Sequence, residues 1–151
     1  MNKTSGITLL ELTIAAAVLM VVVGVVLIGT RGNNNDYRAL HNAALMLQAD
    51  LRYAQRRAVM EGRRVGVQFE PEHNRYHIIT TMPLVYIRTI YFQNGINLLE
   101  TNYPINRVMY LPRGTAIPGR IILTNGNYWQ EITTTLSGGQ VRIHDIIREG
   151  N

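Results

Sequence analysis

The sequence predicts an α+β protein in which an N-terminal transmembrane helix is followed by an amphipathic helix packed on an antiparallel β-sheet. Three observations predict this class. Residues 7–28 form one apolar run, and residues 36–61 repeat apolar side chains at the spacing of a helical face. From residue 64 onward, apolar residues recur with a period of two in several short segments, which is typical of antiparallel strands.

The composition narrows the classes of protein to consider. The length of 151 residues is typical of one domain. Apolar residues make up 46% of the chain and charged residues 17%, which excludes a disordered protein. The formal net charge is +5, and Lys3 is the only lysine, so almost all of the positive charge is carried by arginine. The chain has no cysteine, which excludes disulfides, a thiol nucleophile and cysteine-based metal sites.

The apolar run from Ile7 to Ile28 is long enough to cross a membrane. At about 1.5 Å per residue it spans roughly 33 Å as a helix. Its one charge is Glu11. A carboxylate inside a membrane helix costs on the order of 2.5–3.5 kcal/mol on insertion scales, and such residues usually have a partner and a function. Glu11 lies one turn inside the run, so partial solvation at the membrane interface is the alternative to a dedicated partner.

A short polar leader precedes the run, with a cation at Lys3 and a glycine at Gly6. This leader and the residues Ile7 to Glu11 together resemble the class III signal of type IV pilins and pseudopilins. The resemblance implies that prepilin peptidase, a membrane aspartyl protease, cleaves between Gly6 and Ile7 and methylates the new N-terminus. Glu11 is then the fifth residue of the mature chain. Ile7 departs from the family pattern, because most members have phenylalanine there.

Glu11 has a physical role in this interpretation. Cleavage creates a positive amine on Ile7, which lies in apolar surroundings when subunits pack into a filament. A buried charge is tolerated only when it is paired, and a carboxylate one turn along can pair with the amine. Glu11 is therefore predicted to set the register of subunit assembly. Small residues at 15–17 permit close approach of neighbouring helices.

The expected domain organisation has four parts: a leader at 1–6, a transmembrane and assembly helix at 7–28, a joint at 29–35 and an α+β domain at 36–151. The joint reads GTRGNNN, which favours a break in the helix or a flexible joint. A second helix is expected from Asp36 to Glu61, ended by Gly62. Its buried face is expected to carry six residues spaced 4, 3, 4, 3 and 4 apart: Leu40, Ala44, Leu47, Leu51, Ala54 and Ala58.

Six to eight short strands are expected after this helix. In the first, Val65, Val67 and Phe69 alternate with smaller or polar residues, which predicts a half-buried strand. A turn at 71–75 follows. Further strands are expected at 76–81, 84–92, 108–111, 120–124, 129–136 and 141–144. The dipeptides Asn94-Gly95 and Asn125-Gly126 are typical of hairpin turns.

Two segments, Leu51–Phe69 and Gly119–Ile143, are similar to the GspH/FimT-like pseudopilins, the minor subunits of type II secretion and of related pilus or competence systems. The resemblance implies a pilin-like fold and a structural subunit that primes, tips or enters a membrane-anchored filament. It implies other pilin or pseudopilin subunits as partners. It also implies a single-pass protein of the cytoplasmic (inner) membrane, with a cytoplasmic N-terminus and an extracytoplasmic C-terminal domain.

The sequence offers no case for catalysis. It contains no nucleophile motif, no glycine-rich phosphate loop and no carboxylate pair at catalytic spacing. His73 and His77 bracket the turn near Glu70 and Glu72. These side chains suggest either a surface metal pair or, as we expect, solvated hairpin residues. We therefore expect no enzyme, no cofactor and no metal.

Nucleic-acid binding is the alternative function, as a DNA-binding minor pilin of a competence system. Five arginines cluster near the end of the second helix, where they form either a phosphate-binding patch or a solvated face. Some FimT-like minor pilins bind DNA through a Gly-Arg-x-Arg segment. The matching stretch here, Gly139–Arg142, has glutamine at the first arginine position. The candidate contacts are Arg142, Arg148, Arg56 and Arg57. A third hypothesis is a plain anchored domain that is neither cleaved nor assembled.

Overall fold

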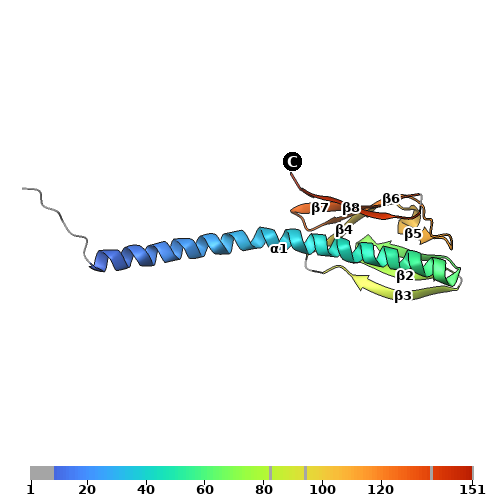
Figure 1. Ribbon diagram of the computed structural model, residues 1–151, viewed down its shortest axis with the longest axis horizontal. Coiled ribbons are helices and arrows are strands. Elements are labelled where there is room, and N and C mark those ends of the chain that lie inside the picture. The colour runs from blue at the N-terminus through green and yellow to red at the C-terminus, as the bar shows by residue number, and fades with distance from the viewer. Residues whose placement is uncertain (1–8, 82, 94, 137, 151) are drawn as a thin grey trace, which may run out of the picture. The chain divides into compact units, whose positions relative to one another are not determined.

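The computed structural model describes residues 9–81, 83–93, 95–136 and 138–150, with the backbone alone over 24–34. The chain divides into two compact units, Met1–Asn35 and Asp36–Asn151. One helix, α1 (Leu9–Glu61), begins in the first unit and ends in the second (Figure 1).

The described part of the first unit is helical, and every side chain from residue 9 to residue 23 is exposed. Leu9 is 82% exposed and Met20 75% exposed. Thr13 Oγ1 donates a 2.8 Å hydrogen bond to the Leu10 carbonyl one turn earlier. Within the described residues, no helix reaches the combination of length and apolarity required to span a membrane.

The backbone over 29–35 differs from the break that the sequence suggests. These residues are helical, and α1 continues through them as one element, although the boundary between the two units falls between Asn35 and Asp36. Glycine and asparagine each cost up to about 1 kcal/mol in a helix relative to alanine. Neither removes a backbone N–H as proline does, so a helix can pass through such a segment.

The second unit confirms the amphipathic helix. All six residues predicted to be buried have no exposed surface: Leu40, Ala44, Leu47, Leu51, Ala54 and Ala58. The helix ends at Glu61 because Gly62 adopts a left-handed conformation with φ of +62°, which glycine reaches without steric cost.

The first sheet has the strand order β3-β2-β1-β5, and all neighbours are antiparallel. Its strands are β1 (Val65–Glu70), β2 (Arg75–Thr81), β3 (Leu84–Tyr91) and β5 (Arg107–Tyr110). The predicted turn after β1 is a short helical turn, η1 (Pro71–His73), closed by Asn74 with φ of +50°. A second such turn, η2 (Pro104–Asn106), precedes β5.

The second sheet has the order β4-β6-β7-β8, again antiparallel. Its strands are β4 (Asn97–Thr101), β6 (Gly119–Thr124), β7 (Tyr128–Thr134) and β8 (Val141–Arg148). The hairpin at Asn125-Gly126 is confirmed, and Asn125 Oδ1 accepts hydrogen bonds from the backbone N–H groups of Asn127 and Tyr128.

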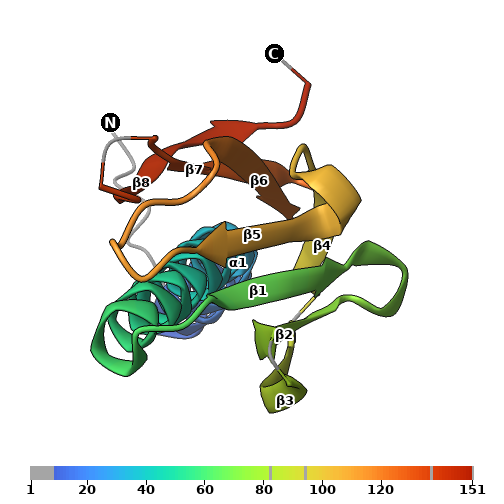
Figure 2. The same ribbon diagram turned by 90° about the vertical axis from the view of Figure 1, so that its right-hand side faces the viewer.

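Three details of the predicted sheet were wrong. The strands form two sheets, not one, as Figure 2 shows from the end of α1. Strand β4 was not predicted. Gly95 lies between β3 and β4, which belong to different sheets, so this glycine serves a crossover instead of a hairpin. Asn94 lies outside the described residues.

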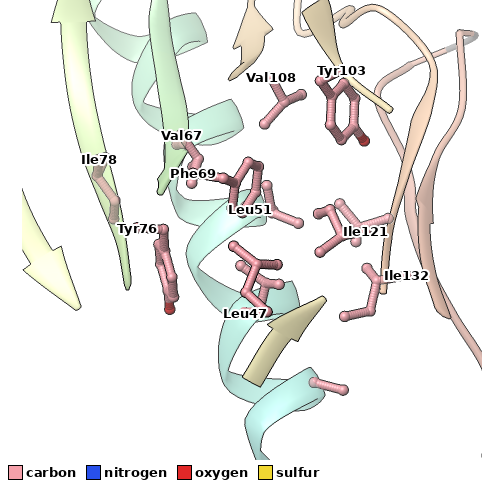
Figure 3. Packing of buried hydrophobic residues seen from close by; sticks show 14 of the residues in the cluster. Leu47, Leu51, Val67, Phe69, Tyr76, Ile78, Tyr103, Val108, Ile121 and Ile132 are labelled. Carbon is pink, nitrogen blue, oxygen red and sulfur yellow. The ribbon is translucent and has the colours of Figure 1, made fainter. Parts of the chain in front are cut away.

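The core of the second unit lies between α1 and the two sheets. Figure 3 shows Leu47 and Leu51 of the helix between Tyr76 of the first sheet and Ile121 and Ile132 of the second. Burial of each large aliphatic side chain contributes about 1.5–3 kcal/mol. The helix therefore joins the sheets, and it fixes which loops lie beside its exposed face.

Candidate functional site

The residues predicted to be processed, Gly6 and Ile7, lie outside the described residues. Glu11 is described, and it lies in the first turn of α1, where a carboxylate interacts favourably with the helix dipole. It is exposed among apolar neighbours such as Leu10 and Leu12, which are 69% and 63% exposed. This stretch therefore presents an apolar helical surface interrupted by one acidic side chain.

A second candidate surface lies where α1 meets the start of β8. Here a hollow of about 450 Å³, which we call the strand-side hollow, is lined by Arg52, Gln55, Arg56, Gln140, Val141 and Arg142. The structure thus brings together Arg56 and Arg142, which the sequence proposed separately. It gives neither of them a carboxylate partner within the residues it describes.

Gln55 fixes this region of the surface. Its Nε2 donates hydrogen bonds to the Gly114 carbonyl at 2.7 Å and to the Gly138 carbonyl at 2.5 Å. The two loops also touch directly, because a Cβ on Gly139 would lie 2.6 Å from the Gly114 carbonyl oxygen. Gly139 has φ of +57°, so it suits this position on conformational grounds as well. The Gln55 side chain therefore holds the β5–β6 loop and the β7–β8 loop together.

Gln48, two turns earlier on the same helix, extends this attachment. Its Nε2 donates a 3.0 Å hydrogen bond to the Val141 carbonyl, at the first residue of β8. Arg142 is the next residue and is exposed. The two glutamines thus hold the start of β8 against α1, which places the Arg142 side chain beside Arg52 and Arg56. This role of the glutamines could not be predicted from the sequence, because their partners are backbone carbonyls distant along the chain.

The other two candidate arginines lie elsewhere. Arg57 Nε donates to Glu61 Oε1 at 2.6 Å, and its Nη1 donates to Tyr53 Oη at 2.8 Å. The Glu61 bond raises the pKa of Arg57. Arg148 pairs with Tyr128 at the opposite end of β8 from Arg142, about 20 Å away at the rise of a strand. Neither belongs to the strand-side hollow.

The histidines near the first turn surround a single carboxylate. Glu70 accepts from Arg75 Nε at 2.7 Å and lies 3.1 Å from His77 Nε2 and 3.4 Å from His73 Nδ1. The Arg75 guanidinium holds the pKa of Glu70 below its ordinary value. His77 is buried, with Nδ1 2.8 Å from Thr89 Oγ1, so its expected solvation was wrong.

The part of the chain that the structure describes has no group of three or more His, Asp or Glu side chains placed to hold a metal ion. Glu70 is instead engaged by the arginine of its own hairpin. The arrangement is that of a strand pair held by a side-chain ion pair between Arg75 and Glu70.

The family model of the type II transport protein GspH matches residues 43–142, more than half of the chain. No curated protein sequence matches the chain. Among solved structures, the minor pseudopilin EpsH of the Vibrio cholerae type 2 secretion system is similar at a TM-score of 0.59 and 13% identity, covering 74% of this chain and 98% of that one.

A second similar structure is the type IV minor pilin FimU of Pseudomonas aeruginosa, at a TM-score of 0.58 and 16% identity. It covers 70% of this chain and 88% of that one. At such low identities these likenesses establish a shared fold. They agree with the helix and two antiparallel sheets described above.

Proposed function

The chain belongs to the GspH family of type II transport proteins, and we propose that it is a minor subunit of a membrane-anchored, pilus-like filament. In this proposal the protein is structural and not catalytic. Its partners are other pilin or pseudopilin subunits. Prepilin peptidase is a transient partner, which processes the chain once before assembly. The chain is anchored in the cytoplasmic membrane by residues 7–28, with its second unit on the extracytoplasmic side.

The observation that carries this proposal is the exposed apolar stretch of α1. Large hydrophobic side chains from Leu9 to Val23 are 48–82% exposed. A soluble monomer rarely exposes such a continuous apolar surface, because burying it elsewhere is favourable. Lipid before assembly and neighbouring helices after assembly supply the missing cover.

Glu11 sets the register in this proposal. Cleavage after Gly6 leaves a methylated amine on Ile7, and the Glu11 carboxylate neutralises it within the chain or from a neighbouring subunit. A charge in apolar surroundings costs several kcal/mol unless it is paired. Subunits that bring the amine and the carboxylate together are therefore favoured over those in a shifted register.

The test replaces the carboxylate and leaves the helix intact. We expect Glu11→Ala and Glu11→Gln to reach the membrane at normal levels but to co-purify at least tenfold less with the other filament subunits. Thr13→Ala, two residues along the same exposed helix, is the matched control and should behave as the unchanged protein. Normal co-purification of both Glu11 variants would contradict the register proposal.

The strand-side hollow favours a second candidate function, the capture of DNA during uptake. Arg52, Arg56 and Arg142 surround one hollow, and guanidinium groups bind phosphate oxygens in a bidentate manner. Such binding weakens with salt because counterions are released from the DNA. Arg57 and Arg148, outside the hollow, contribute little in this proposal.

DNA capture is tested with the full chain in detergent and a labelled DNA duplex at several salt concentrations. The double variant Arg56→Glu/Arg142→Glu should retain less DNA. It should also reduce the slope of the logarithm of the binding constant against the logarithm of salt concentration by about two, the value expected for two lost phosphate contacts. Arg148→Glu is the control and should retain most binding. Equal losses in both variants, or salt-independent retention, would contradict a site in this hollow.

A further inference from the structure

A larger hollow lies at the C-terminal end of α1. Figure 2 shows this end of the helix facing the viewer. The volume of the hollow is about 680 Å³, and we call it the helix-end hollow. It is bounded by the residues after the helix, the end of β2 and the loop after β5: Gly62, Arg63, Arg64, Thr81, Leu111, Pro112, Arg113 and Thr115. It is separate from the strand-side hollow, with which it shares no lining residue.

The charge around the helix-end hollow has one sign. Three arginines line it, and no carboxylate does. Arg63 Nε bonds to Glu61 Oε2 at 2.5 Å, and Glu61 is also engaged by Arg57. Within the described residues, the structure provides no carboxylate partner for Arg64 or Arg113. Two guanidinium groups therefore remain available to an acidic ligand.

Apolar side chains lie beside these arginines. Leu111, in the helix-end hollow, is 38% exposed. An adjoining depression shares Arg113 and adds Val59, 51% exposed, and Met60, 85% exposed. Exposed aliphatic groups with arginine at their edge are typical of protein interfaces, which are enriched in arginine and methionine.

The lining residues favour an acidic ligand with an apolar group over a single-stranded nucleic acid. Neither the helix-end hollow nor the adjoining depression is lined by an aromatic residue. Proteins that bind single-stranded nucleic acids stack the bases on aromatic rings. An arginine fork matches a carboxylate as well as a phosphate, and the aliphatic floor requires an apolar group from the ligand.

We propose that the helix-end hollow docks a partner filament subunit through a segment that presents an aliphatic side chain flanked by carboxylates. The aliphatic group packs on Leu111, and the carboxylates pair with Arg64 and Arg113. The inference rests on the proposed function, because it takes the partner to be another subunit of the same filament. It adds a contact on the second unit to the one proposed for α1.

The test uses the full chain in membranes that contain the other filament subunits. A photoreactive phenylalanine derivative replaces Leu111 in one preparation and Leu99 in another. Leu99 is 57% exposed on β4 of the other sheet and is the matched control. We expect a cross-link from position 111 to another subunit, in a peptide that carries at least two carboxylates. Position 99 should give none.

Charge variants then test the arginines. Arg64→Glu combined with Arg113→Glu should reduce the cross-link from position 111 at least tenfold. Arg120→Glu, whose arginine pairs with Glu100 on the surface of the second sheet, should leave it unchanged. The proposal is overturned by no adduct at position 111, by a nuclease-sensitive adduct, or by an adduct with a peptide that lacks carboxylates.

A third probe separates this inference from the proposed function. Val18 lies in the exposed apolar stretch of α1 and is 57% exposed. Cross-links to other subunits from position 18 but not from position 111 would overturn the docking site and leave the filament proposal standing. Absence of cross-links from both positions would overturn both.

Discussion

The Tyr76 hydroxyl on β2 donates a 2.7 Å hydrogen bond to Oδ2 of Asp50 on α1, inside the interface between the helix and the first sheet. The Arg88 guanidinium on β3 pairs with the other oxygen, Oδ1. Asp50 is only 8% exposed, and a buried carboxylate is stable when its oxygens are paired in this way. Burial and the Asp50 bond raise the pKa of Tyr76, so it remains the neutral donor.

Tyr76→Phe is expected to destabilise the second unit by about 1–3 kcal/mol, because it leaves a buried carboxylate oxygen without its donor. Tyr110→Phe is the matched control. The Tyr110 hydroxyl is buried without a hydrogen-bond partner in the described residues, so its removal should change stability by less than about 0.5 kcal/mol or raise it. Urea unfolding followed by the fluorescence of Trp129, the only tryptophan, measures both. Equal effects would contradict the role of the Tyr76–Asp50 bond.

Gly139→Ala is expected to destabilise the chain by roughly 2–4 kcal/mol, since its Cβ would collide with the Gly114 carbonyl at a left-handed backbone position. Gly126→Ala provides the comparison. Gly126 also has a positive φ, of +85°, but open space surrounds its added Cβ, so only the backbone cost of about 1 kcal/mol is expected. The same unfolding assay compares the two. Similar losses would show that the two loops are not in close contact.

Acid should weaken the hairpin of β1 and β2. The Arg75 guanidinium lowers the pKa of Glu70 below its ordinary value of about 4.3, so the folded state binds this proton less readily than the unfolded state. The stabilisation from this pair is therefore present above pH 4.3 and is lost as the pH falls through the folded-state pKa. Arg75→Gln should show a smaller loss of stability between pH 5 and pH 3 than the unchanged protein. An identical acid profile for the two would contradict this assignment.

The sequence could predict the second-unit helix because its signal is local. Leu40 to Ala58 repeat at helical spacing, and all of them are buried as expected. Strand β4 lacked such a signal, since Leu98 is its one buried residue. The division into two sheets depends on which strands pair across the chain, and no alternation within a strand encodes that choice.

The two arginine-lined hollows also depend on tertiary contacts that the sequence does not reveal. Arg56 and Arg142 were candidates as residues, but their meeting depends on the bonds of Gln48 and Gln55 to distant carbonyls. Arg113 was not a candidate from the sequence, because it is an isolated cation in a loop. Only the fold brings it beside Arg63 and Arg64. The sequence identifies the arginines, whereas the tertiary structure is needed to show which of them lie side by side.

The central claim is that this chain is processed and assembled as a pilin-like subunit, and the mass of its N-terminus tests that claim most directly. The protein is taken from membranes that contain its own prepilin peptidase, with a known pilin as a control for peptidase activity. The account predicts a chain that begins at Ile7 with one added methyl group. A chain that still begins at Met1 or Asn2, while the control pilin is cleaved, would contradict it.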